Sequence, residues 1–206
     1  MKVTHFYQSC LLIEEGSARI LIDPSGEEAE RFDSFGQLDA VLYTHEHHDH
    51  FEPALAEKFH ASGVPVYANA STAKLMNFEP NVVTDGQEIT AKDVVIKAIE
   101  LPHCLLPNGK EGPQNTGYLI NEKLFHPGDG KELEGLQVDN LALPITGPDI
   151  SIRDAFAFAV QLGAKVTFPI HYDTLGAKPE AYKAFVERLG FEFELRLLPN
   201  GTSTEL

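Results

Sequence analysis

The side chains best suited to chemistry gather in one short segment, Thr44–Phe51, which reads THEHHDHF. It follows an apolar run, Asp39–Tyr43, with the length of a buried strand. Side chains of an extended segment alternate between two faces, so His45, His47 and Asp49 are predicted to point the same way before the chain bends. Imidazole and carboxylate are the ligands that Zn²⁺ and related ions favour, and burying so many polar groups would be costly without such a partner. The segment therefore predicts a metal site, the alternative being a solvated loop rich in histidine.

Three further polar residues occupy similar positions, each after an apolar run: His103 after Val94–Pro102, Asp129 after Leu124–Gly128, and His171 after Val166–Ile170. A single histidine after a strand is more often a hydrogen-bonded structural residue than a metal ligand. Loops at strand ends converge on functional sites, however, and a metal-ligating side chain stands at each of these ends. We therefore expect the three residues to join the segment Thr44–Phe51 at one site.

Strands and turns account for most of the sequence. Strands are predicted at Lys2–Gln8, Cys10–Glu14, Ala18–Asp23, Ala40–Thr44, Val64–Ala68, Asn81–Thr84, Gln87–Thr90 and Asp93–Leu101, and then at Thr116–Asn121, Lys123–His126, Asn140–Ile145, Lys165–Ile170 and Phe191–Leu198. Helical spacing is found at Pro53–Ser62, Ser71–Asn77, Ser151–Gly163 and Pro179–Leu189, whereas Pro24–Gln37 reads as a polar loop. Two groups of strands with helices after each predict an α/β (α+β) fold, in which two sheets pack face to face with helices outside.

The composition excludes several classes of protein. The chain has 206 residues, a length that suits one domain spanning residues 1–206. The formal net charge is −15 and no segment is rich in Lys and Arg, so we expect no nucleic-acid partner. No apolar run reaches the roughly 18 residues of a membrane span, and Met1–His5 does not open a signal peptide. We expect a cytoplasmic protein with a small-molecule substrate, and the sequence is compatible with a homo-oligomer.

Together, these motifs resemble those of the metallo-β-lactamase-fold hydrolases. The matching pieces are spread along the chain: Ile20–Pro24, Thr44–His50, His103, Asn115–Tyr118, His126–Asp129, Leu143–Ile145 and Phe168–Tyr172. The resemblance implies an αββα sandwich of two mixed sheets with a dinuclear metal site at one sheet edge. The ligands it implies are His45, His47 and His103 for the first ion and Asp49, His50 and His171 for the second, with Asp129 bridging the two.

The resemblance also implies the chemistry of the site. Two divalent ions, Zn²⁺ foremost with Mn and Fe as alternatives, would hold a bridging hydroxide that attacks a carbonyl or phosphoryl centre. Asp49 is the expected catalytic residue, because its carboxylate can ligate a metal, orient the water and move a proton. Asp23 is expected to orient a ligand histidine from behind, or else to be only a turn-forming Asp-Pro. Tyr172, beside His171, is expected either to donate a hydrogen bond to an oxyanion or to pack.

Within the family, the short chain and the Pro-Ile-His-Tyr segment Pro169–Tyr172 resemble the small UPF0173/UlaG-like metal-dependent hydrolases. The residues Phe51–Pro53 depart from the glycine pair of glyoxalase II and the Gly-Leu-Pro of tRNase Z, which match less well. We expect hydrolysis of a small ester, lactone or phosphodiester, the alternative being a non-hydrolytic metal-binding or iron redox module on the same fold. The loop Cys104–Gln114 is a candidate lid, and Lys110 or Arg153 is a candidate contact for an anionic substrate.

Overall fold

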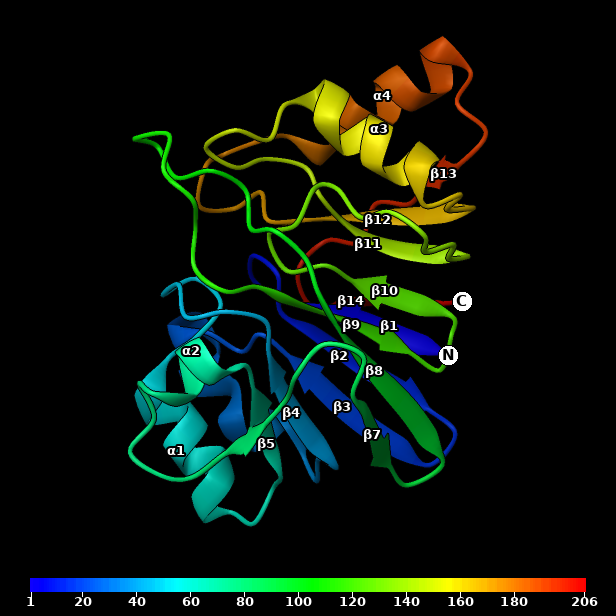
Figure 1. Ribbon diagram of the computed structural model, residues 1–206. Coiled ribbons are helices and arrows are strands. Elements are labelled where there is room, and N and C mark those ends of the chain that lie inside the picture. Colours follow the sequence, from blue (N-terminus) through cyan, green and yellow to red (C-terminus); the bar gives the residue numbers. More distant parts are fainter.

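Two β-sheets lie face to face in the computed structural model, which describes residues 1–206 (Figure 1). The first sheet contains, in spatial order, β14 (Thr202–Glu205), β1 (Lys2–His5), β2 (Leu11–Glu15), β3 (Ala18–Ile22), β4 (Ala40–Tyr43), β5 (Val66–Ala68) and β6 (Asn81–Val82). The second contains β13 (Glu194–Leu195), β12 (Val166–Ile170), β11 (Asn140–Pro144), β10 (Leu124–His126), β9 (Thr116–Ile120), β8 (Val94–Glu100) and β7 (Glu88–Ala91). The helices are the 3₁₀ helix η1 (Gly26–Phe35), α1 (Pro53–Ala61), α2 (Ala70–Ala73), α3 (Ile152–Gln161) and α4 (Pro179–Leu189).

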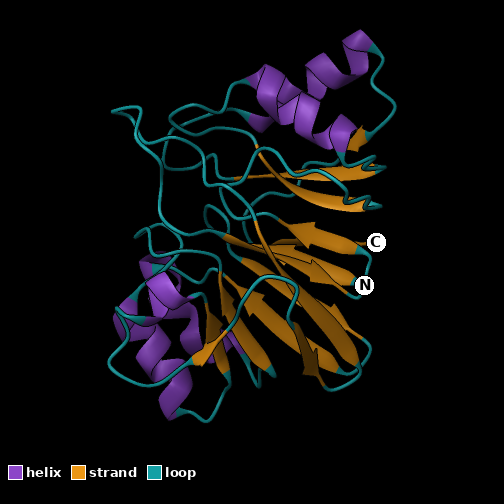
Figure 2. Ribbon diagram, in the orientation of Figure 1, coloured by secondary structure: helices purple, strands orange, loops and turns teal.

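Three apolar clusters hold the layers together. The largest, with 21 buried residues that include Ile13 and Ile96, fills the space between the two sheets. A second cluster, which includes Phe156 and Val186, packs α3 and α4 against the second sheet. A third, which includes Phe59, packs η1 and α1 against the first sheet. The order is therefore helix, sheet, sheet, helix (Figure 2), which confirms the predicted αββα sandwich of mixed sheets. None of the helices combines the length and apolar character needed to cross a membrane.

Strand β4 positions the histidine-rich segment. All of its residues are buried, and it pairs in parallel with β3 on one side and β5 on the other. A parallel strand that is covered on both faces reads as a continuous apolar run, which is how it appears in the sequence. The strand ends at Tyr43, and α1 begins at Pro53, where the Glu52 side chain accepts the N–H of Ala54 and caps the helix. The segment between them is thus anchored at both ends.

The remaining predicted ligands follow strands of the second sheet that run in one direction. Strand β9 is antiparallel to both β8 and β10, so β8 and β10 share a direction, and β10, β11 and β12 are parallel. The carboxyl ends of β8, β10 and β12 consequently lie at the same edge of the sheet. The loops that leave this edge carry His103, Asp129 and His171.

Several predicted elements in the first half of the chain are wrong in detail; the strand predicted at Lys2–Gln8, for example, ends at His5. The predicted loop Pro24–Gln37 contains the helix η1, because the Glu28 carboxylate accepts hydrogen bonds from the backbone N–H and the hydroxyl of Ser25 and caps the first turn. The predicted helix Ser71–Asn77 is the shorter α2, which is capped by the Asn69 side chain. The composition of Pro24–Gln37 does not reveal the Glu28 cap, and the α2 cap stands two residues before the predicted cap, Ser71.

The C-terminal end of the chain also differs from the prediction. Of the predicted strand Phe191–Leu198, only β13 is a strand, and β14 has no counterpart in the prediction. Strand β14 is polar and largely exposed, so no apolar alternation marks it in the sequence. It pairs antiparallel with β1, which brings the two ends of the chain together (Figure 1).

Candidate metal centre

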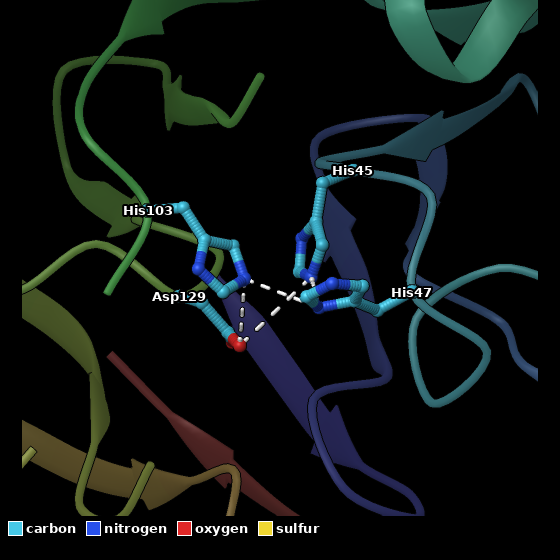
Figure 3. Close-up of side chains that lie close together, drawn as sticks. All are labelled: His45, His47, His103 and Asp129. Carbon is cyan, nitrogen blue, oxygen red and sulfur yellow. Dashed lines mark hydrogen bonds and ion pairs between the residues drawn. The ribbon is translucent and has the colours of Figure 1, made fainter. Parts of the chain in front are cut away.

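The structure brings all of the predicted ligands together at one edge of the sandwich. Their nitrogen and oxygen atoms form two groups, in each of which the atoms lie within 4.8 Å of one another: His45, His47, His103 and Asp129 in one, and Asp49, His50 and His171 in the other. Figure 3 shows the side chains of the first group pointing toward a common centre. The first sheet supplies the residues of the segment Thr44–Phe51, and loops of the second sheet supply the others.

The first group presents imidazole lone pairs to one point. The Nδ1–H groups of His45 and His103 donate to the Thr44 hydroxyl at 3.0 Å and to the Cys104 carbonyl at 2.5 Å, so their Nε2 atoms carry lone pairs. Both Nε2 atoms lie 3.2 Å from Nδ1 of His47, which can donate only one proton. At least one of the two Nε2 lone pairs is therefore left without a proton donor, and a bound cation would satisfy it. A tetrahedral Zn²⁺ with nitrogen ligands at 2.0–2.1 Å separates them by about 3.3 Å, which matches the observed spacing.

Two buried atoms have no hydrogen-bond partner, Nε2 of His50 in the second group and Oδ1 of Asp129, which faces it from the first. They lie 3.1 Å apart, close enough for an ion pair but not aligned for a hydrogen bond. The Nδ1–H of His50 donates to Asp23 at 2.8 Å, which leaves the Nε2 lone pair directed at the centre. The Nε2 atom of His171 lies 3.4 Å from Oδ2 of Asp49 and 3.2 Å from Oδ2 of Asp129. Buried polar atoms are rarely left unpartnered, so these residues fit a metal ion.

Asp129 faces both groups. Its Oδ2 lies 3.3 Å from Nε2 of His103 in the first group and 3.2 Å from Nε2 of His171 in the second. Its Oδ1 faces His50 at 3.1 Å. The Asn115 side chain fixes this position, because its oxygen accepts the N–H of Asp129 at 3.3 Å. The structure thus places the Asp129 carboxylate between the two groups.

The two groups differ in their electrostatics. Burial holds the pKa of His45 well below its ordinary value, so that this imidazole is neutral and ready to ligate at neutral pH. In the second group burial also lowers the histidine pKa values, but the charges and hydrogen bonds of the neighbouring carboxylates together outweigh it: Asp129 and Asp23 for His50, and Asp129 and Asp49 for His171. The pKa of His50 is raised well above its ordinary value, and that of His171 is raised to about 9. The second group thus attracts positive charge, which a proton or a divalent cation can provide.

Asp23 lies behind the centre, where it was predicted. Its fully buried carboxylate accepts the Thr44 N–H at 2.8 Å and the Thr44 hydroxyl at 2.7 Å, in addition to the Nδ1–H of His50. Asn69 donates to the Thr44 carbonyl at 2.9 Å and holds the same segment from the other side. Asp23 therefore connects the end of β3 to a histidine of the centre, and it does more than form a turn.

Three other residues considered in the sequence lie away from the centre or are fully bonded. The Tyr172 hydroxyl lies 3.4 Å from Nδ1 of His5, and its ring packs against the second cluster, as the packing alternative requires. Arg153 lines an apolar groove between α3 and α4 that contains none of the predicted ligands. Both ring nitrogens of His126 are used, since one donates to a backbone carbonyl at 2.8 Å and the other accepts the N–H of Gly128.

The loop Cys104–Gln114 packs directly on the centre. A Cβ atom at Gly112 would lie 2.3 Å from Nδ1 of His103, so only glycine fits this close approach. A cavity of about 690 Å³ opens between this loop and the neighbouring strand ends, and His103 lies in its wall. Lys110 is held in a local turn, in which its carbonyl accepts the N–H of Leu106 and its own N–H donates to the Asn108 side chain, and it does not line this cavity.

One residue of the centre is absent from the sequence prediction. The side-chain N–H of Gln8 donates to Oδ2 of Asp49 at 2.8 Å, and the Gln8 carbonyl accepts the N–H of His171 at 2.8 Å. Gln8 stands in the turn between β1 and β2, in a context that matches no motif of catalytic or metal-binding residues. Only its contacts in the folded chain reveal it.

Known proteins with similar sequences identify the family to which the chain belongs. Residues 2–171 match the family model of a β-lactamase superfamily domain. With its two-sheet fold and histidine-rich centre, the chain belongs to the metallo-β-lactamase superfamily, as the motifs indicated. Its relatives include a UPF0173 protein of Pyrococcus furiosus, 32% identical over 91% of each chain. The UPF0173 metal-dependent hydrolase of Nanoarchaeum equitans is 30% identical over 93% of this chain and 94% of its own.

Solved structures share the fold. The metallo hydrolase Igni18 of Ignicoccus hospitalis superimposes with a TM-score of 0.79 at 24% identity, over 100% of this chain and 98% of its own. The metallo-β-lactamase fold protein YhfI of Bacillus subtilis superimposes with a TM-score of 0.77 at 16% identity, over the same shares of the two chains. At these identities the likeness establishes the fold alone.

Proposed function

We propose that this protein is a metal-dependent hydrolase with two divalent ions and that it cleaves a small ester, lactone or phosphodiester. Its family supports the class of reaction, because relatives such as the Nanoarchaeum equitans protein carry the name metal-dependent hydrolase. The proposed ligands are His45, His47 and His103 for the first ion and Asp49, His50 and His171 for the second, with Asp129 contacting both. Zinc suits this set of imidazoles and carboxylates best, with manganese and iron as alternatives.

One observation carries the proposal: imidazole nitrogens and carboxylate oxygens converge, and several of them have no hydrogen-bond donor directed at them. The 3.2 Å spacing around Nδ1 of His47 and the unpartnered Nε2 of His50 both call for a cation. Two divalent ions bound there would supply a hydroxide at neutral pH and polarise the oxygen of the scissile bond. The remaining chemistry falls to the side chains around them.

Asp49 is the proposed proton acceptor. Gln8 and His171 both face its Oδ2, which leaves Oδ1 to receive a proton from the attacking water. Burial alone would raise the pKa of Asp49, but the hydrogen bond with His171 and the charge of His50 hold it well below its ordinary value. The carboxylate therefore stays ionised before reaction. Asp23 keeps the Nδ1 proton of His50 in place, so that the opposite nitrogen faces the centre.

The cavity beside His103 has a size that suits a small molecule. Its wall contains four carboxylates, those of Glu100, Glu111, Glu132 and Asp149. The single lysine there, Lys131, is engaged by Asp149 at 2.7 Å. A phosphate group would meet like charge in this cavity, so among the three proposed substrate classes an uncharged ester or lactone fits better than a phosphodiester.

Metal analysis of the purified protein, followed by a panel of lactones, esters and phosphodiesters, tests the proposal. We expect two equivalents of metal per chain and the highest turnover with an uncharged lactone or ester. Asp49→Ala should lower hydrolysis by about 10²–10⁴-fold, because it removes the proton acceptor. The matched control is Asp139→Ala, which removes an exposed carboxylate paired only with Lys165 and should leave the rate unchanged.

Full activity in a metal-free protein would contradict the proposal. So would a chain that is loaded with iron, consumes dioxygen and hydrolyses none of the panel, since that result identifies the redox alternative. If Asp49→Ala kept the wild-type turnover, the proposed role of Asp49 would be wrong. The metal analysis would then decide alone whether the protein is a two-ion hydrolase.

A further inference from the structure

Gln8 has an unusual conformation for its position. It is fully buried in the turn between β1 and β2, and its φ is 58°, in the left-handed region that non-glycine residues seldom adopt. His171 has a φ of 59° and donates its backbone N–H to the Gln8 carbonyl at 2.8 Å. Two residues in this costly conformation are thus joined directly, and such strain persists only where surrounding contacts hold it.

Every polar group of Gln8 is bonded to a loop of the second ion site or to the turn beside it. Its side-chain oxygen accepts the backbone N–H groups of Asp173 and Thr174 at 3.0 Å and 3.1 Å, and its own N–H donates to the Asp173 carboxylate at 2.8 Å. Its side-chain nitrogen donates to Oδ2 of Asp49 at 2.8 Å. One side chain therefore connects the loop of Asp49 with the loop of His171.

The first ion site has no such connection. The ring nitrogens of His45 and His103 that face away from the centre are held by the Thr44 hydroxyl and the Cys104 carbonyl, and Gln8 makes no hydrogen bond to either residue. The two sites share Asp129 and the Asp23–Thr44 pair, but only the second is bonded to Gln8.

We propose that Gln8 is the positioning residue of the second ion site: it fixes the Asp49 carboxylate and the backbone of His171 at the spacing that a metal ion needs. This role rests on the proposed two-ion function, and it assigns Gln8 to the second site and not to the first. A residue that merely formed the turn between β1 and β2 would affect both ion sites equally, through the stability of the fold.

Stepwise metal titration distinguishes these two roles. Zinc is titrated into the metal-free chain against a competing chelator, and cobalt is titrated in parallel so that the absorption spectrum reports each site. Gln8→Met keeps the length of the side chain and removes its hydrogen bonds. Gln8→Glu keeps the acceptor for Asp173 and Thr174 but removes the donor to Asp49 and places a like charge beside it. The matched control is Gln87→Met, at an exposed glutamine whose side chain bonds only to Thr84.

We expect both Gln8 variants to bind the second ion about 10–100-fold more weakly than the wild type, the range measured for residues that orient metal ligands. The first ion should bind within about twofold of the wild type, as should both ions in the control. An equal loss at both sites, or wild-type affinity for the second ion in both variants, overturns the role of Gln8 and leaves the hydrolase proposal intact. A wild-type chain that takes up a single ion contradicts the two-ion function itself, before any variant is compared.

Discussion

Replacing Asp23 by asparagine should misplace one proton at the proposed second ion site. In the native chain the carboxylate accepts three hydrogen bonds, two from Thr44 and one from the Nδ1–H of His50. An amide has one oxygen and one N–H₂ group, so the asparagine cannot accept hydrogen bonds from both Thr44 and His50 as the two carboxylate oxygens do. With its oxygen toward the Thr44 N–H, its N–H₂ group points at Nδ1 of His50. The histidine then moves its proton to Nε2, the atom that faces Asp129 at 3.1 Å.

The size of the effect follows from this geometry. A proton on Nε2 blocks the proposed metal ligand, and changes to residues that orient a ligand weaken metal binding about 10–100-fold. That range corresponds to roughly 1.4–2.7 kcal/mol. The metal-free fold is affected as well, because the buried Thr44 hydroxyl loses a carboxylate acceptor, and hydrogen bonds to charged groups contribute about 1.5–3 kcal/mol each. Asp23→Asn should therefore lower both the affinity for the second ion and the free energy of unfolding.

Chelator-competition titration measures the first quantity, and urea unfolding of the metal-free chain measures the second. Asp39→Asn is the matched control. Asp39 also stands at the end of a strand and accepts a backbone N–H, but it lies just before β4, whereas the residues of the centre follow the opposite end of β4. An Asp23→Asn chain that binds both ions with wild-type affinity would refute the reasoning, whatever its stability.

Three further predictions concern residues outside the proposed ligand set. Glu15→Gln should lower the unfolding free energy by less than about 1 kcal/mol at pH 7. The hydrogen bond from Lys123 lowers the pKa of Glu15, so the pair stabilises the fold above the ordinary carboxyl pKa, and this contribution is lost as the pH falls through the lowered value. Urea unfolding at a series of pH values tests this dependence. Gly128→Ala should lower the unfolding free energy by about 2 kcal/mol or more in thermal unfolding, because φ is 60° there and a Cβ would lie 2.2 Å from the Asn115 side chain. His126→Leu should destabilise the fold by about 1–3 kcal/mol, through an unpartnered backbone carbonyl and N–H, yet leave the metal content at the wild-type value in elemental analysis.

The sequence predicts the sandwich because its strands carry strong local signals. Strand β4 is apolar throughout and its neighbours are nearly so, and the polar residues that follow β4 stand out against that background. His103 and His171 each follow such a run, so their convergence could be predicted from strand direction alone. The helix Pro179–Leu189 is correct at both ends, because Pro179 suits the first turn and Gly190 ends the helix in the left-handed conformation.

The supports of the centre could not be predicted in this way. Gln8 acquires its importance from Asp49 and Asp173, which lie 41 and 165 positions away along the chain. No periodicity or spacing encodes contacts over such separations. Strand β14 is hidden for a related reason, since it is polar and becomes a strand only because β1 offers a free edge. Local patterns thus predict which residues bear the chemistry, whereas the residues that hold them in place emerge only from the fold.

The pairing of β1 with β14 has a consequence for the order of folding. Lys2 pairs with Glu205, so this contact closes a loop of nearly the whole chain, and contacts between such distant segments carry the largest entropic cost and form slowly. Gln8 lies in the turn between β1 and β2, and its partner Asp173 also lies far along the sequence. We expect the second ion site to mature after the first, so that the uptake of a second ion marks the completion of the native fold.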